Sequence, residues 1–172
     1  DKVCDNISDT ILDECLKQDE NSRVAIETFA SSNTITIAGQ ITSTARIKIG
    51  EIVREKLKEI GYDNAQTDID YRTCNINADI TKQSADIALG VDVGGAGDQG
   101  IMFGYATNET KELMPMPIML ANKLAYNLTK VRKEDKDSPL LPDGKTEVTV
   151  EYQDDIPKRI DTILSLIHIW RC

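Results

Sequence analysis

Apolar residues near the start of the chain recur at the spacing of an amphipathic helix. Between Val3 and Gln18 they stand three or four positions apart, with acidic residues between them, so one face of the helix is apolar. Two β-prone runs follow, Arg23 to Ala30 and Thr34 to Thr42, and Ser31 to Asn33 between them is turn chemistry. In the second run isoleucines alternate with polar residues, which predicts a β-hairpin with one polar face.

A second amphipathic helix is predicted from Ser43 or Thr44, either of which can cap it, to Ile60, with Gly61 placed to end it. Its charged residues are of mixed sign, which is typical of a solvated face. After a polar loop, Cys74 to Ile80 alternates again and predicts a further strand.

The middle of the chain is rich in glycine. Lys82 to Gly97 has little apolar periodicity and predicts a mobile loop that can close over a site, although a flexible linker between subdomains fits the composition too. Ile101 to Thr107 is β-prone and is predicted to form a buried strand. A helix is then predicted from Pro117, a favoured residue of a first helical turn, to Lys133.

The last part of the chain predicts a second hairpin. Lys133 to Lys145 is charged and contains proline, which indicates a surface connection, and Pro142 to Gly144 predicts a turn that presents the Lys145 ammonium just before a strand. Asp154 and Asp155 turn the chain, and Lys158 to Ile163 is the expected partner strand.

Composition excludes several classes of protein. The chain has 172 residues, of which 40% are hydrophobic and 28% charged, as in ordinary globular domains. Its net charge of −9 excludes a broad nucleic-acid surface, and no long apolar run is present, so we expect a soluble, cytoplasmic protein with no membrane or nucleic-acid partner. The four cysteines lack C-x-x-C spacing and are expected to be reduced thiols.

Both ends of the chain differ from its interior. Leu164 to Cys172 holds the single histidine and the single tryptophan, and resembles the translation of a sequencing-library adaptor. We interpret this tail as non-native; the alternative is a short apolar strand. At the other end, Asp1 and Lys2 enter a helix with no preceding strand or cap.

The glycine-rich stretch also carries candidate chemistry. Gly95, Gly97 and Gly100 have the spacing G-x-G-x-x-G, but no helix is predicted after them, which argues against a dinucleotide site. Asp98 places a carboxylate inside the glycine turn, where it suits a positively charged ligand or a metal-bound anion. Scattered carboxylates together with Lys145 suit a magnesium-bound polyphosphate, and covalent catalysis is disfavoured because the nucleophile motifs are missing.

The sequence GAGDQG, followed by a hydrophobic stretch and GYATNET at residues 104–110, resembles the signature of S-adenosylmethionine synthetases. The resemblance covers Asp1 to Ile163. It implies an enzyme in which the sulfur of L-methionine attacks C5′ of ATP, with release of phosphate and pyrophosphate. It also implies Mg²⁺ and K⁺ as cofactors and a homo-oligomer whose sites are shared between subunits.

The resemblance further implies a role for individual residues. Asp98, beside the ribose and the sulfonium, and Lys145, beside the triphosphate, are the catalytic candidates. The resemblance places Lys2, Asp143, Gly144 and Lys145 at the ATP site. It places Gln40 and Gln83 at the methionine site, and it makes Asp1 a ligand of Mg²⁺ and Glu27 a ligand of K⁺.

Three of these assignments need comment. From the residues alone, Glu27 is expected on the wet face of its strand, because a buried carboxylate needs a cation, whereas the resemblance makes it a K⁺ ligand. Gln40 stands where the family has a glutamate that contacts the methionine amino group, and Leu141 stands in place of a family arginine.

The expected fold is α+β, built from two-layer α/β sandwich units. The resemblance implies the first of three intertwined repeats plus part of the second: an N-terminal domain at 1–93, the start of a central domain at 94–163, and the tail at 164–172. We expect this polypeptide alone to be inactive. Two other classes stay open, a non-catalytic nucleotide- or metal-binding module and a dimerisation module.

Overall fold

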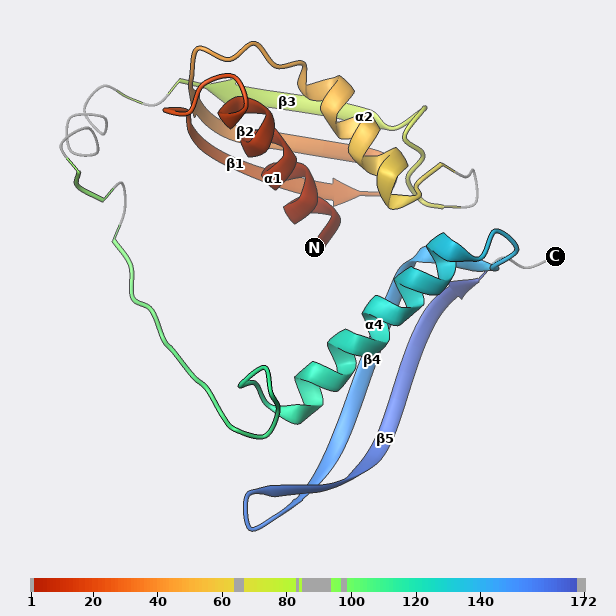
Figure 1. Cartoon of the computed structure of the whole chain (residues 1–172). Helices are drawn as coiled ribbons and strands as arrows, with labels where there is room; N and C mark the ends of the chain where they lie inside the picture. Colours follow the sequence, from red (N-terminus) through yellow and green to blue (C-terminus); the bar gives the residue numbers. More distant parts are fainter. Residues whose placement is uncertain (1, 64–66, 83, 85–93, 97–98, 170–172) are drawn as a thin grey trace. The chain divides into compact units, whose positions relative to one another are not determined.

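The computed structural model describes residues 2–63, 67–82, 84, 94–96 and 99–169. The chain divides into two compact units, Asp1–Gly100 and Ile101–Cys172, and each is described by itself (Figure 1). The expected α+β class is confirmed, because helices and sheets occur in both units.

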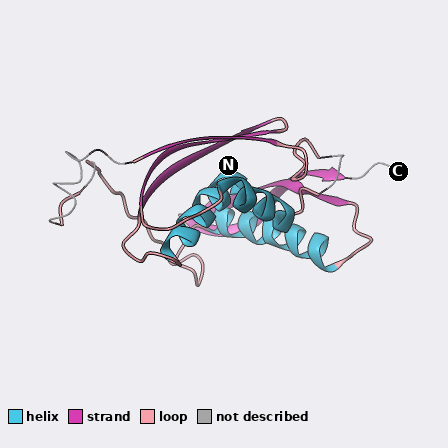
Figure 2. Ribbon diagram, turned by 90° about the horizontal axis from the view of Figure 1, so that it is seen from above, coloured by secondary structure: helices cyan, strands magenta, loops and turns pink. Residues whose placement is uncertain are grey.

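The first unit is a three-stranded sheet with two helices on one side (Figures 1 and 2). Its elements, in chain order, are α1 (Lys2–Leu16), β1 (Arg23–Ser31), β2 (Thr34–Thr42), α2 (Ile49–Ile60) and β3 (Asn75–Thr81). The predicted hairpin is the antiparallel pair β1–β2. β3 pairs parallel to β2 along its other edge, and α2 provides the crossover that a parallel pair requires.

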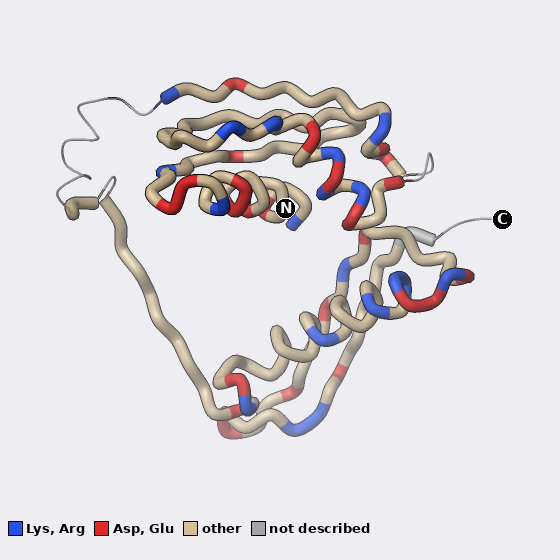
Figure 3. The backbone as a smooth tube through the Cα atoms, turned by 45° about the horizontal axis from the view of Figure 1, so that its top comes forward, with Lys and Arg blue, Asp and Glu red and all other residues tan. Residues whose placement is uncertain are grey.

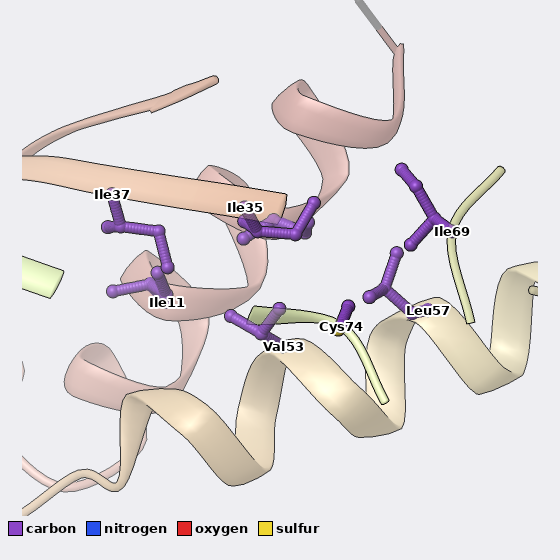
Figure 4. Packing of buried hydrophobic residues seen from close by; sticks show 8 residues of the cluster. Ile11, Ile35, Ile37, Val53, Leu57, Ile69 and Cys74 are labelled. Atoms are coloured by element: carbon purple, nitrogen blue, oxygen red, sulfur yellow. The ribbon is translucent and has the colours of Figure 1, made fainter. Parts of the chain in front are cut away.

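The core of this unit lies between the sheet and the two helices. Ile7 and Ile11 come from one face of α1, and Val53 and Leu57 from one face of α2, at a spacing of four residues in each case. Isoleucines at alternate positions of β2, together with Ile69 and Cys74, close the cluster (Figure 4). The periodicities read from the sequence therefore correspond to real buried faces.

α2 begins at Ile49, so the predicted start at Ser43 or Thr44 is wrong. The reason is an acidic side chain in the loop after α1. Asp19 Oδ2 accepts hydrogen bonds from the Thr44 N–H at 2.8 Å, the Thr44 hydroxyl at 3.1 Å and the Ser43 hydroxyl at 3.2 Å. These bonds, chiefly the one from the Thr44 N–H, lower the pKa of Asp19. They hold Ser43 and Thr44 against the loop after α1, so neither residue caps α2.

The end of α2 is as predicted. Gly61 has φ 111°, in the left-handed region, and its N–H bonds to the carbonyls of Leu57 and Lys58. Glycine adopts this conformation without the steric penalty of a Cβ atom.

The second unit is a hairpin with one helix packed on it (Figure 1). It consists of α4 (Met116–Glu134), β4 (Leu140–Gln153) and β5 (Ile156–Ile169), with β4 and β5 antiparallel. The predicted helix and hairpin are confirmed, and Asp154 and Asp155 form the turn with φ values of 53° and 61°. β5 runs on through residues 164–169, so this part of the tail is extended as in the alternative interpretation.

Two expectations for the second unit are wrong. Residues 101–107 form no strand, and Ile101, Met102 and Phe103 are 80%, 90% and 89% exposed. A β-prone run becomes a strand only when its N–H and C=O groups pair with a neighbour, and no described strand pairs with this one.

Pro142 to Gly144 lies within β4 instead of forming a separate turn. The register with β5 shifts between Leu140 and Gly144, and such an irregularity accommodates a proline that cannot donate to the ladder.

Within the described residues, no helix is both long enough and apolar enough to cross a membrane.

Candidate functional site

The side of the first sheet that faces away from the helices carries two candidate residues. Exposed and buried positions alternate along β1 and β2, and Glu27 and Gln40 both fall on this side, which we call the open face. Glu27 pairs with Ala38, and Gln40 pairs with Ala25 on the same two strands. Glu27 and Gln40 are therefore diagonal neighbours, whose Cα atoms are typically about 7–8 Å apart in an antiparallel pair.

The third strand of the sheet, β3, extends the open face. In β3, Asp79 pairs with Ala38 and Thr81 pairs with Gln40. One row across the sheet thus runs from Glu27 through Ala38 to Asp79, and the Cα atoms of the two acidic residues are about 10 Å apart at the usual strand spacing. The middle strand bears no charged side chain, whereas β1 has Arg23 four residues before Glu27, on the same side of the strand. Figure 3 marks the basic and acidic positions along the chain.

Gly39 sets the close approach of the two strands beside Gln40. Its φ is 146°, and a Cβ atom placed there would lie 2.1 Å from the Ala25 carbonyl oxygen. On the other side, the Thr81 hydroxyl donates to the Gly39 carbonyl at 3.4 Å. Only glycine fits this position, and the signal in the sequence is a glycine inside a clean alternation.

Glu27 is exposed, as its residue type alone predicted. It forms no ion pair with any residue that the structure describes. An unpaired carboxylate with a second carboxylate in the same row offers hard oxygen ligands to a cation.

The other set of candidates lies at the start of β4 in the second unit. Asp143, Gly144 and Lys145 are all exposed, and neither charged side chain forms an ion pair with a described residue. The next residue fixes their orientation, because the Thr146 hydroxyl donates to the Ala121 carbonyl of α4 at 2.8 Å. Since side chains alternate along a strand, Lys145 points away from the helix into solvent.

The structure brings some candidates together and leaves others out. Lys2 begins α1 and is exposed. Asp1, Gln83 and Asp98 lie outside the described residues. In the part of the chain that is described, no group of three His, Cys, Asp or Glu side chains forms a ready metal site.

One acidic residue of the second unit was not singled out by the sequence. Glu109 lies in the segment before α4 and accepts hydrogen bonds from Thr107, Met116 and Tyr152. The sequence does contain a signal for Glu109. Pro115, which precedes α4, provides no side-chain cap, so the free N–H groups at the start of α4 need an acceptor from another residue.

Comparison with known families decides what these units are. The S-adenosylmethionine synthetase N-terminal domain model matches residues 1–85, and the model of the central domain of the same enzyme matches residues 93–169. The chain belongs to the S-adenosylmethionine synthetase family. The resemblance carried by the glycine-rich signature is thereby confirmed.

Individual synthetases agree with this assignment. The S-adenosylmethionine synthase of Mesoplasma florum is 52% identical over 171 residues, which are 97% of this chain and 45% of that protein. The synthases of Finegoldia magna and Clostridium botulinum are 51% and 49% identical over 178 residues, with 95% of this chain and 45% and 46% of theirs covered. The chain therefore spans less than half the length of the synthetases that it matches.

Proposed function

We propose that this chain is the N-terminal and central part of an enzyme that forms S-adenosylmethionine from ATP and L-methionine. The observation that carries the proposal is the match to two successive synthetase domains in the right order. The sulfur of methionine forms a bond to C5′ of ATP while the bond from C5′ to the triphosphate breaks. The triphosphate leaves with its electron pair and is hydrolysed to phosphate and pyrophosphate.

On this proposal the open face of the first sheet binds the amino acid. Gln40 accepts a hydrogen bond from the methionine ammonium, and Gln83 contacts the carboxylate. Gln40 is half-buried, and its strand is paired on both edges, with Ala25 of β1 and Thr81 of β3 opposite it. A neutral amide supplies a weaker bond to an ammonium than a carboxylate does, and methionine binding through Gln40 is correspondingly weak.

Glu27 fits a K⁺ ligand, because it is an exposed, unpaired oxygen donor on the same face. The Cα atom of Asp79 is about 10 Å away across two strands in the same row, and two carboxylates do not fill the coordination shell of a K⁺ ion. Glu27 would therefore be one ligand among several. A bound K⁺ would offset the negative charge of this row and so favour an anionic substrate nearby.

Lys145 and its neighbours handle the phosphates. An exposed ammonium without an ion-pair partner is available to a triphosphate as a compact positive charge. Asp143, Gly144 and Lys2 complete the ATP contacts, and Asp1 is the candidate Mg²⁺ ligand. When bound, Mg²⁺ neutralises phosphate oxygens, which makes the triphosphate a better leaving group.

Asp98 is the candidate for the developing sulfonium. A carboxylate beside a sulfur that becomes positively charged lowers the energy of the transition state more than that of the neutral thioether. We also propose that the protein acts in the cytoplasm as a homo-oligomer whose sites are shared between copies.

The test joins this chain to the part of the Mesoplasma florum synthase that it does not cover. The purified chimera is expected to form S-adenosylmethionine from ATP and methionine, as measured by mass spectrometry, whereas the chain alone is expected to form none. Lys145→Ala in the chimera should lower the rate strongly, and Lys158→Ala, which removes an exposed lysine from β5 of the same hairpin, should not.

Two results would contradict the proposal. A folded chimera that binds Mg-ATP in calorimetry but forms no product would indicate a non-catalytic nucleotide-binding module. A folded chimera that self-associates strongly in sedimentation but binds neither ATP nor methionine would indicate a dimerisation module.

A further inference from the structure

The strand that bears Lys145 is bonded to α4 through the residue that follows this lysine. The Thr146 hydroxyl donates to the Ala121 carbonyl at 2.8 Å, across 25 positions of sequence. Thr146 is half-buried, whereas Lys145 and Glu147 on either side of it are exposed. Because side chains alternate along a strand, Thr146 points toward the helix and its two neighbours point away from it.

Thr146 is the polar member of the row of β4 that faces α4. Gly144 and Val148 stand two positions before and after it, on the same side of the strand. Val148 is buried, and a Cβ atom placed at Gly144 would lie 3.8 Å from a methyl carbon of Leu128 in α4. Apolar contacts have no preferred direction, whereas a hydrogen bond does. The directional contact of this row therefore comes from Thr146.

Apolar burial alone specifies this part of the hairpin weakly. Ile163 and Leu164 of β5 pair with adjacent residues of β4 and lie on opposite sides of the sheet. They are 53% and 50% exposed, so burial hardly favours one face of β5 over the other. The register also shifts between Leu140 and Gly144, just before Lys145. A slip by one residue turns every side chain of a strand to the other face, so a specific bond beside this irregularity decides where Lys145 points.

A second hydroxyl near Lys145 does not have this effect. The Ser165 hydroxyl donates to the Lys145 carbonyl at 3.2 Å. Ser165 is exposed and belongs to β5 of the same hairpin, so its bond joins the two strands to each other. It does not relate either strand to α4, as the bond of Thr146 does.

We propose that Thr146 is a positioning residue for the adenosyl transfer. Its bond to α4 fixes the face of β4 from which Lys145 presents its ammonium to the triphosphate. This inference rests on the proposed function, in which Lys145 contacts the phosphates, and every residue that carries it belongs to the second unit. A charged group that is held in place before the reaction contributes more to the rate than one that must first be ordered.

The first test measures the bond in the chain itself, without any activity. Thr146→Val removes the hydroxyl at nearly constant volume, whereas Thr146→Ser keeps it. The ¹³C resonance of the Ala121 carbonyl should shift in Thr146→Val and stay near its original position in Thr146→Ser. The matched control is Thr149→Val, which replaces an exposed threonine on the other face of β4 and should leave this resonance unchanged.

Hydrogen exchange of the same variants measures what the bond does to the strand. In Thr146→Val the protection factors of the β4 amides next to position 146 should fall by roughly twofold to tenfold, the effect of one lost hydrogen bond. Those near Gln153, at the far end of β4, should change less. Thr146→Ser and Thr149→Val should both keep the protection of the unmodified chain.

The second test measures positioning in the chimera. Thr146→Val should lower kcat by roughly tenfold to a hundredfold, because misplacement of a catalytic group has effects of this size, and should leave the KM for methionine nearly unchanged. Thr146→Ser should restore most of the kcat, and Thr149→Val should keep the kcat of the unmodified chimera.

A double-variant comparison shows whether Thr146 acts through Lys145. In a chimera that already carries Lys145→Ala, the group to be positioned is gone, so Thr146→Val should lower the remaining rate by less than about twofold. Product that accumulates over hours, measured by mass spectrometry, gives this rate. A purely structural role would instead lower the rate by the same factor with and without the Lys145 ammonium.

Several outcomes would overturn the inference. One is an Ala121 resonance that is unchanged in folded Thr146→Val. Others are a lost bond with an unchanged kcat, and equal losses of rate in the two backgrounds. If the unmodified chimera is folded but inactive, the proposed function fails and the positioning role fails with it, whereas an active chimera that is indifferent to Thr146→Val overturns the positioning role alone.

Discussion

The two units use the same arrangement of helix on sheet but bury very different amounts of side chain. In the first unit α1 and α2 bury Ile7, Ile11, Val53 and Leu57 completely against three strands. In the second, α4 has no buried residue, and Val148 is the one hydrophobic residue of its described part that is buried. A two-stranded hairpin offers too little surface to cover a helix face.

This difference shows that an amphipathic pattern predicts which face of a helix or strand is apolar. It does not predict whether another element buries that face. Ile160, Ile163 and Leu164 of β5 are 46%, 53% and 50% exposed, although all three lie in a strand that is paired along its length with β4. The stability of the chain should therefore reside mainly in the first unit.

The largest expected effect on stability comes from truncating a buried isoleucine, with an exposed isoleucine as its control. Ile37 of β2 is completely buried, whereas Ile163 of β5 is 53% exposed. Ile37→Ala should lower the free energy of unfolding of the first unit by about 2–5 kcal/mol, because it leaves a cavity, and Ile163→Ala should change that of the second unit by less than about 1 kcal/mol. Urea denaturation followed by the amide NMR signals of each unit measures both, and equal losses would refute the contrast.

A pair of glycines tests the backbone in the same way. Gly39→Ala would place a Cβ atom 2.1 Å from a backbone oxygen, whereas at Gly144 the nearest atom is a Leu128 methyl carbon at 3.8 Å. We expect Gly39→Ala to destabilise the first unit by about 1–3 kcal/mol and Gly144→Ala to change the second by at most about 0.5 kcal/mol. The same denaturation measurement applies, and a tolerated Gly39→Ala would mean that β1 and β2 can separate freely.

Acid should loosen the first unit at one joint. The pKa of Asp19 is lowered below its ordinary value of 3.8. Its contribution to stability is therefore present above the unfolded pKa and is lost as the pH falls through the folded value. Hydrogen exchange of the Thr44 amide, which bonds to Asp19, should accelerate relative to its neighbours in acid. Asp19→Asn should abolish this pH dependence, and an unchanged profile would exclude Asp19 as its cause.

The joint at Glu109 should respond to both acid and alkali. The pKa of Glu109 is lowered from 4.5, and the pKa of Tyr152 is raised from 10.0 to about 12. The first contribution is lost as the pH falls below 4.5. The second is fully present below pH 10.0 and is lost as the pH rises toward 12. The protection factor of the Met116 amide, which is its intrinsic exchange rate at each pH divided by the observed rate, should be highest between these limits. Tyr152→Phe should remove the pH dependence of this factor on the alkaline side alone.

Local patterns predicted much of the fold. The helices, both hairpins, the glycine end of α2 at Gly61 and the outward position of Glu27 follow from spacing and residue type. What failed depends on partners distant in sequence. The Thr44 N–H bonds to Asp19 and does not begin α2, and residues 101–107 have no neighbouring strand among the described residues. Pro142 is accommodated within β4 by a shift in register.

The candidate site shows the same distinction between what local patterns predict and what depends on residues distant in sequence. That Gln40 lies on the polar face of its strand is readable from the alternation, but the row that places Glu27 opposite Ala38 and Asp79 requires the parallel pairing of β2 with β3. No local pattern specifies that pairing. Lys145 was expected in a turn and lies in a strand, although it is exposed in either case.

The most direct test of the account is the KM for methionine of the chimera with Gln40→Glu. If the open face of the first sheet binds the methionine ammonium, the added carboxylate should lower that KM by roughly twofold to fivefold, as expected for a partly exposed charge pair, and leave the KM for ATP unchanged. A folded chimera that forms no S-adenosylmethionine, or a substitution that alters the KM for ATP and not the KM for methionine, would contradict it.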